Sequence, residues 1–155
     1  KEFVSSRINN IRDVFTLCTF ILGDEEADRL APGLADYRKA IAKKLITLTK
    51  HLKEKDIYLF CAGIYGDGAA RILLSAGYNV EGFLDNNRSL HGSKIFCLDV
   101  NSPKILIEKS KRDLTGTAVI ICNQFQRNID AISDQLQEFG LSKEQIIANN
   151  ILEII

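Results

Sequence analysis

Hydrophobic residues in the first third of the chain recur every three or four positions, the spacing that one face of a helix requires. Between residues 3 and 22 they are Val4, Ile8, Ile11, Phe15, Cys18 and Leu22. After the polar connector DEEADRLAP they are Leu34, Tyr37, Ile41, Leu45, Leu48 and Leu52. Gly23 suits the end of the first helix, and Pro32 suits the first position of the second. The pattern therefore predicts two N-terminal helices.

From residue 56 onward the pattern changes to short apolar runs separated by amphipathic stretches. The runs DIYLFCAG, NVEGFLDNN, TAVIICN and EQIIANN are typical of parallel strands that helices cover on both faces, and KIFCL is a shorter strand candidate. Helices are predicted over GDGAARILLSAGY, over PKILIEKSKRD and over residues 126–139. In the second of these, Ser102 would be the N-cap and Pro103 the first helical residue.

This alternation of strands and helices predicts an α/β fold: a Rossmann-like open parallel sheet with flanking helices and right-handed crossovers. The two N-terminal helices precede it. We predict that residues 1–54 form a helical segment that packs on the core or dimerises it. Residues 55–155 are then the Rossmann-like domain.

The segment YLFCAGIYGDGAARILL, residues 58–74, predicts a buried strand, a glycine-rich turn and the start of a helix. In the dinucleotide-binding fingerprint G-x-G-x-x-G, the second glycine lets the backbone approach a pyrophosphate, and the third lets the helix pack closely on the strand. Gly63 and Gly66 occupy these two positions, whereas Cys61 stands at the first. Because cysteine disfavours positive φ, we expect an ordinary or slightly wider turn at Cys61.

Asp85 ends the second strand, about 20 residues after Gly63, where dinucleotide-binding folds place an acid that accepts hydrogen bonds from ribose hydroxyls. An acid at this position disfavours the 2′-phosphate of NADP. The free N–H groups at the helix start attract an anion whichever cofactor is bound. The alternative is a crossover that binds nothing, in which Asp85 caps a loop.

The segment from residue 56 to residue 149 resembles a widespread bacterial Rossmann-like module. The matching residues are Ala62, Gly63, Gly66, Gly77, Val80, Gly82, Phe83, Asp85, Asn86, Gly92, Ser102 and Pro103. Such modules are attached to enzymes of surface-polysaccharide and nucleotide-sugar metabolism, and they precede FkbM-type methyltransferase domains. The resemblance implies a nucleotide or nucleotide-sugar ligand. The chain departs from the family at Cys61, where glycine is usual.

The motif and the resemblance together predict a nucleotide-binding site at the carboxyl edge of the sheet. Its residues would be Ala62, Gly63, Ile64, Tyr65, Gly66, Asp85, Asn86 and Asn123, with Gln124 and Arg127 as further polar candidates. NAD or a UDP-sugar-like nucleotide is the favoured ligand. SAM is less favoured, because class I methyltransferases usually carry an acid near the end of strand one, where this chain has Leu59, Phe60 and Cys61.

The sequence assigns no catalytic residue. Short-chain nucleotide-sugar enzymes use a Tyr-x-x-x-Lys pair as base and pKa-lowering partner, and none of the four tyrosines has a lysine four residues later. Cys61 and Cys122 both end parallel strands, where a thiol is either a nucleophile or a small buried hydrophobe. His91 lies in the loop after Asp85 and either overhangs the site or lies on the surface.

Composition narrows the class of protein. Lys and Arg total 20, as do Asp and Glu, so the excess positive charge typical of nucleic-acid binding is absent, and we expect no nucleic-acid partner. No apolar run is long enough for a membrane span. The cysteines lack the spacing of a zinc site and favour a reducing, cytoplasmic setting. The chain begins at Lys1 and contains no methionine, so we expect it to be a piece of a longer protein.

Three functions stay open at this point. The first is a nucleotide- or nucleotide-sugar-binding module of a larger sugar- or polysaccharide-modifying protein. The second is part of an enzyme, a methyltransferase or an NAD-dependent sugar-modifying enzyme, whose catalytic domain lies outside this chain. The third is a structural domain that binds nothing and forms a homodimer through its N-terminal helices.

Overall fold

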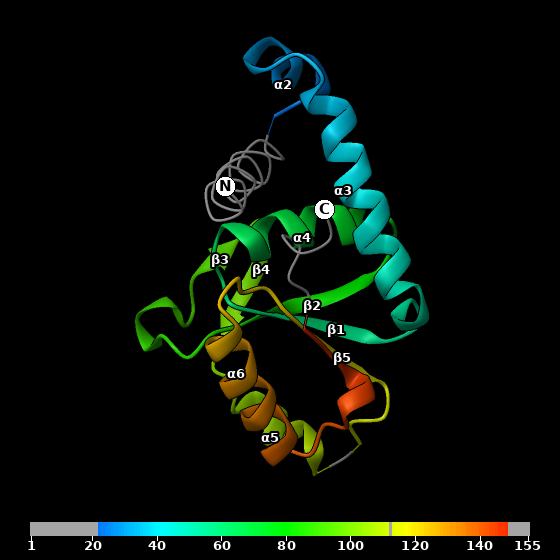
Figure 1. Ribbon diagram of the computed structural model, residues 1–155. Helices are drawn as coiled ribbons and strands as arrows, with labels where there is room; N and C mark the ends of the chain where they lie inside the picture. The colour runs from blue at the N-terminus through cyan, green and yellow to red at the C-terminus, as the bar shows by residue number, and fades with distance from the viewer. Residues whose placement is uncertain (1–21, 112, 149–155) are drawn as a thin grey trace.

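The computed structural model describes residues 22–111 and 113–148 (Figure 1). Within these residues, three helical elements come first: α2 (Asp24–Leu30), α3 (Leu34–Thr49) and the 3₁₀ turn η2 (Lys50–Leu52). The strands are β1 (Asp56–Phe60), β2 (Asn79–Leu84), β3 (Lys94–Ile95), β4 (Leu98–Asn101), β5 (Thr117–Ile121) and β6 (Ile146–Ala148). Between them lie α4 (Ile64–Ser75), η3 (Arg88–Leu90), α5 (Ile105–Ser110), α6 (Gln126–Glu138) and η4 (Lys143–Gln145).

The six strands form one sheet in the order β3-β4-β2-β1-β5-β6. All neighbouring strands are parallel except β3 and β4, which are antiparallel. From β1 the chain adds β2 and β4 on one side, then returns to add β5 and β6 on the other. The predicted α/β fold, a Rossmann-like open parallel sheet with flanking helices, is confirmed. The reversal creates a topological switch point between β1 and β5, where open α/β sheets bind ligands.

Alternate residues of the strands build one apolar core on each face of the sheet. Ile57 and Leu59 of β1 belong to a cluster with α3 and α4, whereas Tyr58 and Phe60 belong to a cluster with α5 and α6. Figure 1 shows α3 and α4 on one side of the sheet and α5 and α6 on the other. All residues of β5 are buried. Covering helices on both faces explain why the strands appear in the sequence as continuous apolar runs.

The pairing of β1 with β2 shifts by one residue near the start of β2. Ile57 pairs with Val80, but Tyr58 pairs with Gly82, so the exposed Glu81 has no partner in the register. Val80 and Phe83 therefore lie in the same cluster, although an odd spacing in a regular strand would place them on opposite faces. The shift keeps both apolar residues in the core beneath α4.

The β3–β4 region differs from the single short strand predicted over KIFCL. Phe96 and Cys97 have φ values of 44° and 61°, and they form a two-residue turn between antiparallel strands in which Ile95 pairs with Leu98. Two positive φ angles match the twist of a tight hairpin. Apolar character alone did not reveal this turn, because it lacks the usual Asn-Gly or Asp-Gly pair.

Two predicted helix starts also differ. Gly33 adopts a left-handed φ of 80° immediately before α3, so Pro32 precedes the helix instead of opening it. Before α5 the N–H groups of Ile105 and Leu106 bond to carbonyls three residues back. A tight turn therefore comes before the regular helix, and Lys104 takes the N-cap position instead of Ser102. Both helices are nevertheless present at the predicted places.

The predicted first helix, residues 3–22, lies outside the described residues apart from its last position, and so does Cys18. The second predicted N-terminal helix corresponds to α3 and η2, and Ile41, Leu45 and Leu52 join the core cluster of the sheet. The polar connector contains α2. Over residues 22–111 and 113–148, no helix combines the length and the apolar character that crossing a membrane requires.

Candidate functional site

The candidate site lies at the carboxyl ends of β1 and β5, on either side of the switch point. Phe60 pairs with Ile121 at the last position of these two strands. The glycine turn follows β1 and leads into α4, and residues 122–125 follow β5 and lead into α6. The loop after β2, with Asp85, lies beside the turn because β2 is the other neighbour of β1.

Cys61 has a φ of 80°, so the expectation of an ordinary or wider turn at this residue is wrong. Hydrogen bonds on both sides hold the conformation: Cys61 N donates to Leu84 O (2.9 Å), and Ala62 N donates to the Asp85 carboxylate (2.8 Å). The turn keeps the shape that a first glycine would adopt. Steric strain of a non-glycine residue at positive φ, of about 1–2 kcal/mol, is the cost.

Gly66 has the role of the third glycine in the fingerprint. A Cβ at this position would lie 2.4 Å from Cys61 O and 2.9 Å from Phe83 Cε1, distances that real side chains do not tolerate. The first turn of α4 therefore packs directly against the end of β1 and against β2. Any side chain at residue 66 would push α4 away from the sheet.

Gly63 is different, because a Cβ there would meet no atom of the described residues within 4 Å. Its backbone is extended and Gly63 is the N-cap of α4, with no side-chain hydrogen bond at the cap. Among the described residues, the space that a side chain of residue 63 would take is therefore empty. The first N–H groups of a helix lack partners within the helix and carry partial positive charge.

Asp85 is half-buried, and the backbone uses both of its carboxylate oxygens. Oδ2 accepts from Ala62 N and Oδ1 accepts from Asn87 N, each at 2.8 Å. One side chain thus joins the glycine turn to the loop after β2. A carboxylate has about four acceptor positions, so two acceptor positions remain for other donors.

Two side-chain contacts cross the switch point. The Tyr65 hydroxyl donates to Gln124 Oε1 at 2.7 Å, and Asn123 Nδ2 donates to Cys61 Sγ at 3.5 Å. Asn123 Oδ1 also accepts from Phe125 N at 2.9 Å, which fixes the start of α6. These contacts bring the glycine turn and the end of β5 together.

Asn86 occupies a different environment from the other predicted residues. Its amide exchanges two hydrogen bonds with Gln135 of α6, at 2.9 and 3.0 Å. Gln135 was not a candidate in the sequence, because 49 positions separate the two residues and only the fold brings them together. The pair ties the loop after β2 to α6.

The His91 side chain contacts the backbone of Asp85, directly after the end of β2. Its Nε2 lies 2.7 Å from Asp85 O, and since a carbonyl oxygen only accepts, Nε2 carries the hydrogen in this contact. The half-buried ring therefore supports the loop that holds Asp85. His91 therefore helps to position this loop, a role that no pattern in the sequence indicated.

Apolar side chains are exposed at the starts of both helices beside the switch point. Ile64 of α4 is 49% exposed and Phe125, the N-cap of α6, is 59% exposed. α4 and α6 lie on opposite faces of the sheet (Figure 1). The edge therefore combines the N-terminal ends of two helices with exposed apolar surface.

The thiols at this edge are weak nucleophiles. Burial is the main cause that raises the pKa of Cys61; Asp85 adds to this effect, while the Asn123 hydrogen bond opposes it. Burial also raises the pKa of Cys122 far above its usual range. Both cysteines are protonated at neutral pH, and the thiolate is the reactive form. The protonated state favours the interpretation that these thiols are small buried hydrophobic groups and not nucleophiles.

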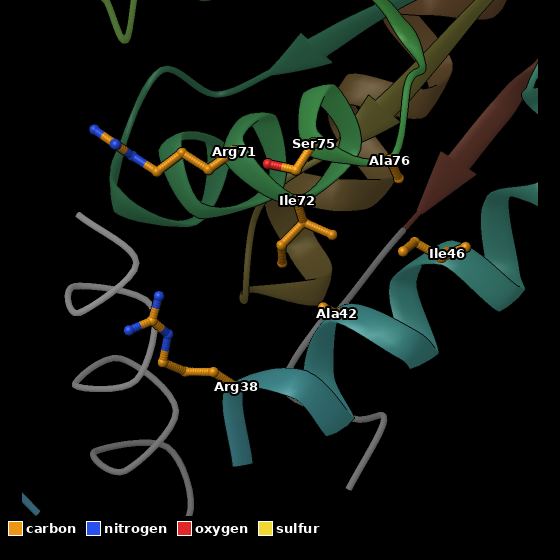
Figure 2. Close-up of a pocket in the computed structure, with 7 residues that line it drawn as sticks. All are labelled: Arg38, Ala42, Ile46, Arg71, Ile72, Ser75 and Ala76. Carbon is orange, nitrogen blue, oxygen red and sulfur yellow. The ribbon is translucent and has the colours of Figure 1, made fainter. Parts of the chain in front are cut away.

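A pocket of about 370 Å³ lies elsewhere, between α3 and α4 (Figure 2). Its lining is Arg38, Ala42, Ile46, Arg71, Ile72, Ser75 and Ala76. Most of these residues belong to the helical layer on one face of the sheet, away from the strand ends. Within the part of the chain that the structure describes, no group of three or more His, Cys, Asp or Glu side chains is placed to hold a metal ion.

No model of a known protein family matches the chain, and no curated protein matches it significantly. The resemblance to modules of polysaccharide enzymes and FkbM-type methyltransferases therefore finds no support in these comparisons. Among solved structures, the chain is similar to RSP, a Rex-family repressor, with 23% identity and a TM-score of 0.49. This match covers 65% of this chain and 56% of the RSP chain, little more than half of that chain.

Two further structures of RSP match at similar levels. The complex of RSP with β-NADH matches with 22% identity and a TM-score of 0.47, over 65% of this chain and 56% of that chain. The complex of RSP with β-NAD⁺ and operator DNA matches with 17% identity and a TM-score of 0.48, over 94% and 84%. At these identities the likeness concerns the fold alone.

The expectation that nucleic acid is excluded as a partner is wrong. RSP, a protein of similar architecture, has been solved in complex with operator DNA. The expectation rested on net charge, which sums over the whole chain. Binding to nucleic acid depends instead on where Lys and Arg gather. A balanced total is therefore not evidence against a nucleic-acid partner.

Proposed function

We propose that this chain is a Rossmann-like module that binds a nucleotide or a nucleotide-sugar at the carboxyl edge of its sheet, beside the switch point between β1 and β5. NAD and a UDP-sugar-like nucleotide are the leading ligands. The observation that best supports this proposal is the contrast between two glycines. A side chain at Gly66 would collide with Cys61 and Phe83, whereas a Cβ at Gly63 would meet no described atom within 4 Å. This is the division of tasks that a phosphate-binding turn requires.

The phosphates would lie against residues 63–66. Gly63, the N-cap of α4, makes no side-chain cap hydrogen bond, and the N-terminus of a helix attracts an anion through its N–H groups. The helix dipole adds attraction. Gly63 would allow phosphate oxygens to approach the backbone without meeting a side chain.

The ribose would lie near Asp85. Its two backbone hydrogen bonds hold the carboxylate in one position, and its two remaining acceptor positions suit the neighbouring hydroxyls of a ribose. Preorganisation of this kind lowers the entropy that binding costs. The same carboxylate would repel a 2′-phosphate, which favours NAD over NADP.

The remaining part of the ligand would lie across the switch point. Tyr65, Asn123 and Gln124 supply hydroxyl and amide groups there, and Ile64 and Phe125 supply exposed apolar surface for a flat ring. Binding pockets for nucleotides combine such apolar walls with a few polar groups. The finer proposal, that the module serves a larger sugar- or polysaccharide-modifying protein, is supported by the sequence resemblance.

Titration calorimetry against NAD, NADH, UDP-glucose and SAM tests the proposal. We expect the chain to bind NAD or UDP-glucose, and we expect Gly63→Ala to weaken that binding at least tenfold, because the new methyl group occupies the phosphate path. Circular dichroism and thermal unfolding should show the same fold for both chains. Absence of binding by the folded chain to all four compounds would overturn the proposal, as would equal affinity in Gly63→Ala.

A further inference from the structure

An acidic residue stands in the first turn of α4, close to the turn that would hold the phosphates. Asp67 is the fourth residue of this helix, so its charge lies within about 6 Å of the helix start along the axis. A carboxylate there stabilises the helix itself. It also repels an anionic ligand, and a phosphate-binding helix needs that repulsion to be offset.

Arg71 offsets the charge of Asp67. Arg71 Nε lies 3.0 Å from Asp67 Oδ1, one helical turn away, and the two side chains are only 23% and 27% exposed. Partial burial weakens the screening by water and salt that makes most surface ion pairs ineffective. The pair therefore lowers the negative potential at the start of α4.

The Arg71 guanidinium also contacts the aromatic ring of Phe96. The guanidinium carbon lies 4.0 Å from the centre of the Phe96 ring, a distance that gives a cation–π attraction. Phe96 reaches this position from the β3–β4 turn, where its own φ is 44° and that of Cys97 is 61°. Two adjacent non-glycine residues at positive φ cost free energy, and the contact with Arg71 offsets part of that cost.

We propose that Arg71, held by Phe96, is a positioning residue that neutralises Asp67 and thereby lets the first turn of α4 accept a phosphate-bearing ligand. This inference rests on the proposed function. Arg71 does not touch the ligand in this scheme. It acts on binding through the charge of Asp67.

The test compares a charged ligand with its uncharged nucleoside. Whichever of NAD and UDP-glucose binds more tightly is titrated together with adenosine or uridine, respectively. We expect Arg71→Gln to weaken binding of the charged ligand about three- to tenfold, the effect of one partly screened charge, and to leave nucleoside binding within about twofold. Since only charge is at issue, Arg71→Lys should retain most of the affinity.

Removal of the Asp67 charge, which Arg71→Gln leaves without its cationic partner, identifies the cause of the lost affinity. The double variant Asp67→Asn with Arg71→Gln should regain the wild-type affinity within about twofold, because the carboxylate is gone. Phe96→Leu should give a smaller loss than Arg71→Gln. Lys111→Gln is the matched control, since Lys111 pairs with Glu108 on the exposed surface at the end of α5, and it should leave affinity unchanged.

Three results would overturn the inference while the proposed function stands: wild-type affinity in Arg71→Gln, equal losses for nucleotide and nucleoside, or no recovery in the double variant. A wild-type chain that binds no nucleotide would overturn both proposals. Circular dichroism of each variant separates loss of charge from loss of fold.

Discussion

Cys61 holds a backbone conformation that residues other than glycine rarely adopt, and the bonds on both sides of it explain why. Leu84 O receives its N–H, and Asp85 receives that of Ala62. The fold therefore over-determines the turn, and the strain is retained instead of relaxing into a wider loop. A position that looked like a break in the fingerprint thus preserves the geometry of the fingerprint.

Cys61→Gly should raise the free energy of unfolding by about 1 kcal/mol. Relief of positive-φ strain raises the free energy of unfolding by about 1–2 kcal/mol. The greater backbone entropy of glycine in the unfolded chain lowers it by about 0.5–1 kcal/mol. Urea denaturation measures the change. Cys61→Ala is the control, because it keeps the strain and loses the Asn123 contact, so it should not stabilise. A destabilised glycine variant would show that the Cys61 side chain matters more than its φ angle.

At the scale of elements, the closeness of α4 to β1 and β2 determines the shape of the glycine turn. That closeness depends on a missing side chain at Gly66, beside Cys61 O and Phe83. The sequence pattern identified this glycine correctly, because close packing of a helix on a strand has a fixed position in the motif. The β2 register shift and the strained β3–β4 turn had no such marker in the sequence.

Gly66→Ala should destabilise the fold by about 2–3 kcal/mol, the usual effect of forcing an extra group into a packed site. Gly63→Ala is the matched comparison, since its new Cβ meets no described atom within 4 Å and its backbone is extended. It should unfold at the same denaturant concentration as the wild type or slightly higher. Equal stability of the two variants would contradict the close approach of α4 to the strand end.

At the scale of the whole molecule, several ionisable groups lie in the apolar layers on both faces of the sheet. Burial raises the pKa of Cys122 and of Cys61, and it also raises the pKa of Tyr58. The folded state keeps these groups protonated at a pH where the unfolded chain releases their protons. The contribution of the two thiols to stability is therefore complete below the ordinary pKa of a thiol, about 8.5, and is lost as the pH rises above it, whereas that of Tyr58 is lost only above about pH 10.

Stability should thus fall between pH 8.5 and pH 10, with a slope of up to about 1.4 kcal/mol per pH unit for each thiol involved. Guanidinium denaturation at intervals over this range measures the slope. Cys122→Ala removes the most deeply buried thiol, so its curve should be flatter than that of the wild type, even if its stability at pH 7 is lower. Parallel curves would contradict a protonated Cys122 in the folded state.

The sequence by itself determined the alternation of the main strands and helices, the two-faced burial of the strands and the close packing at Gly66. These features follow from local periodicity and from steric rules at single positions. Only the tertiary structure decided the positive φ of Cys61, the use of Asp85 as a bridge between two loops, and the links from Asn86 to Gln135 and from Arg71 to Phe96. Each of these depends on atoms far apart in the chain, which come together only once parallel pairing has placed β2 and β5 on either side of β1.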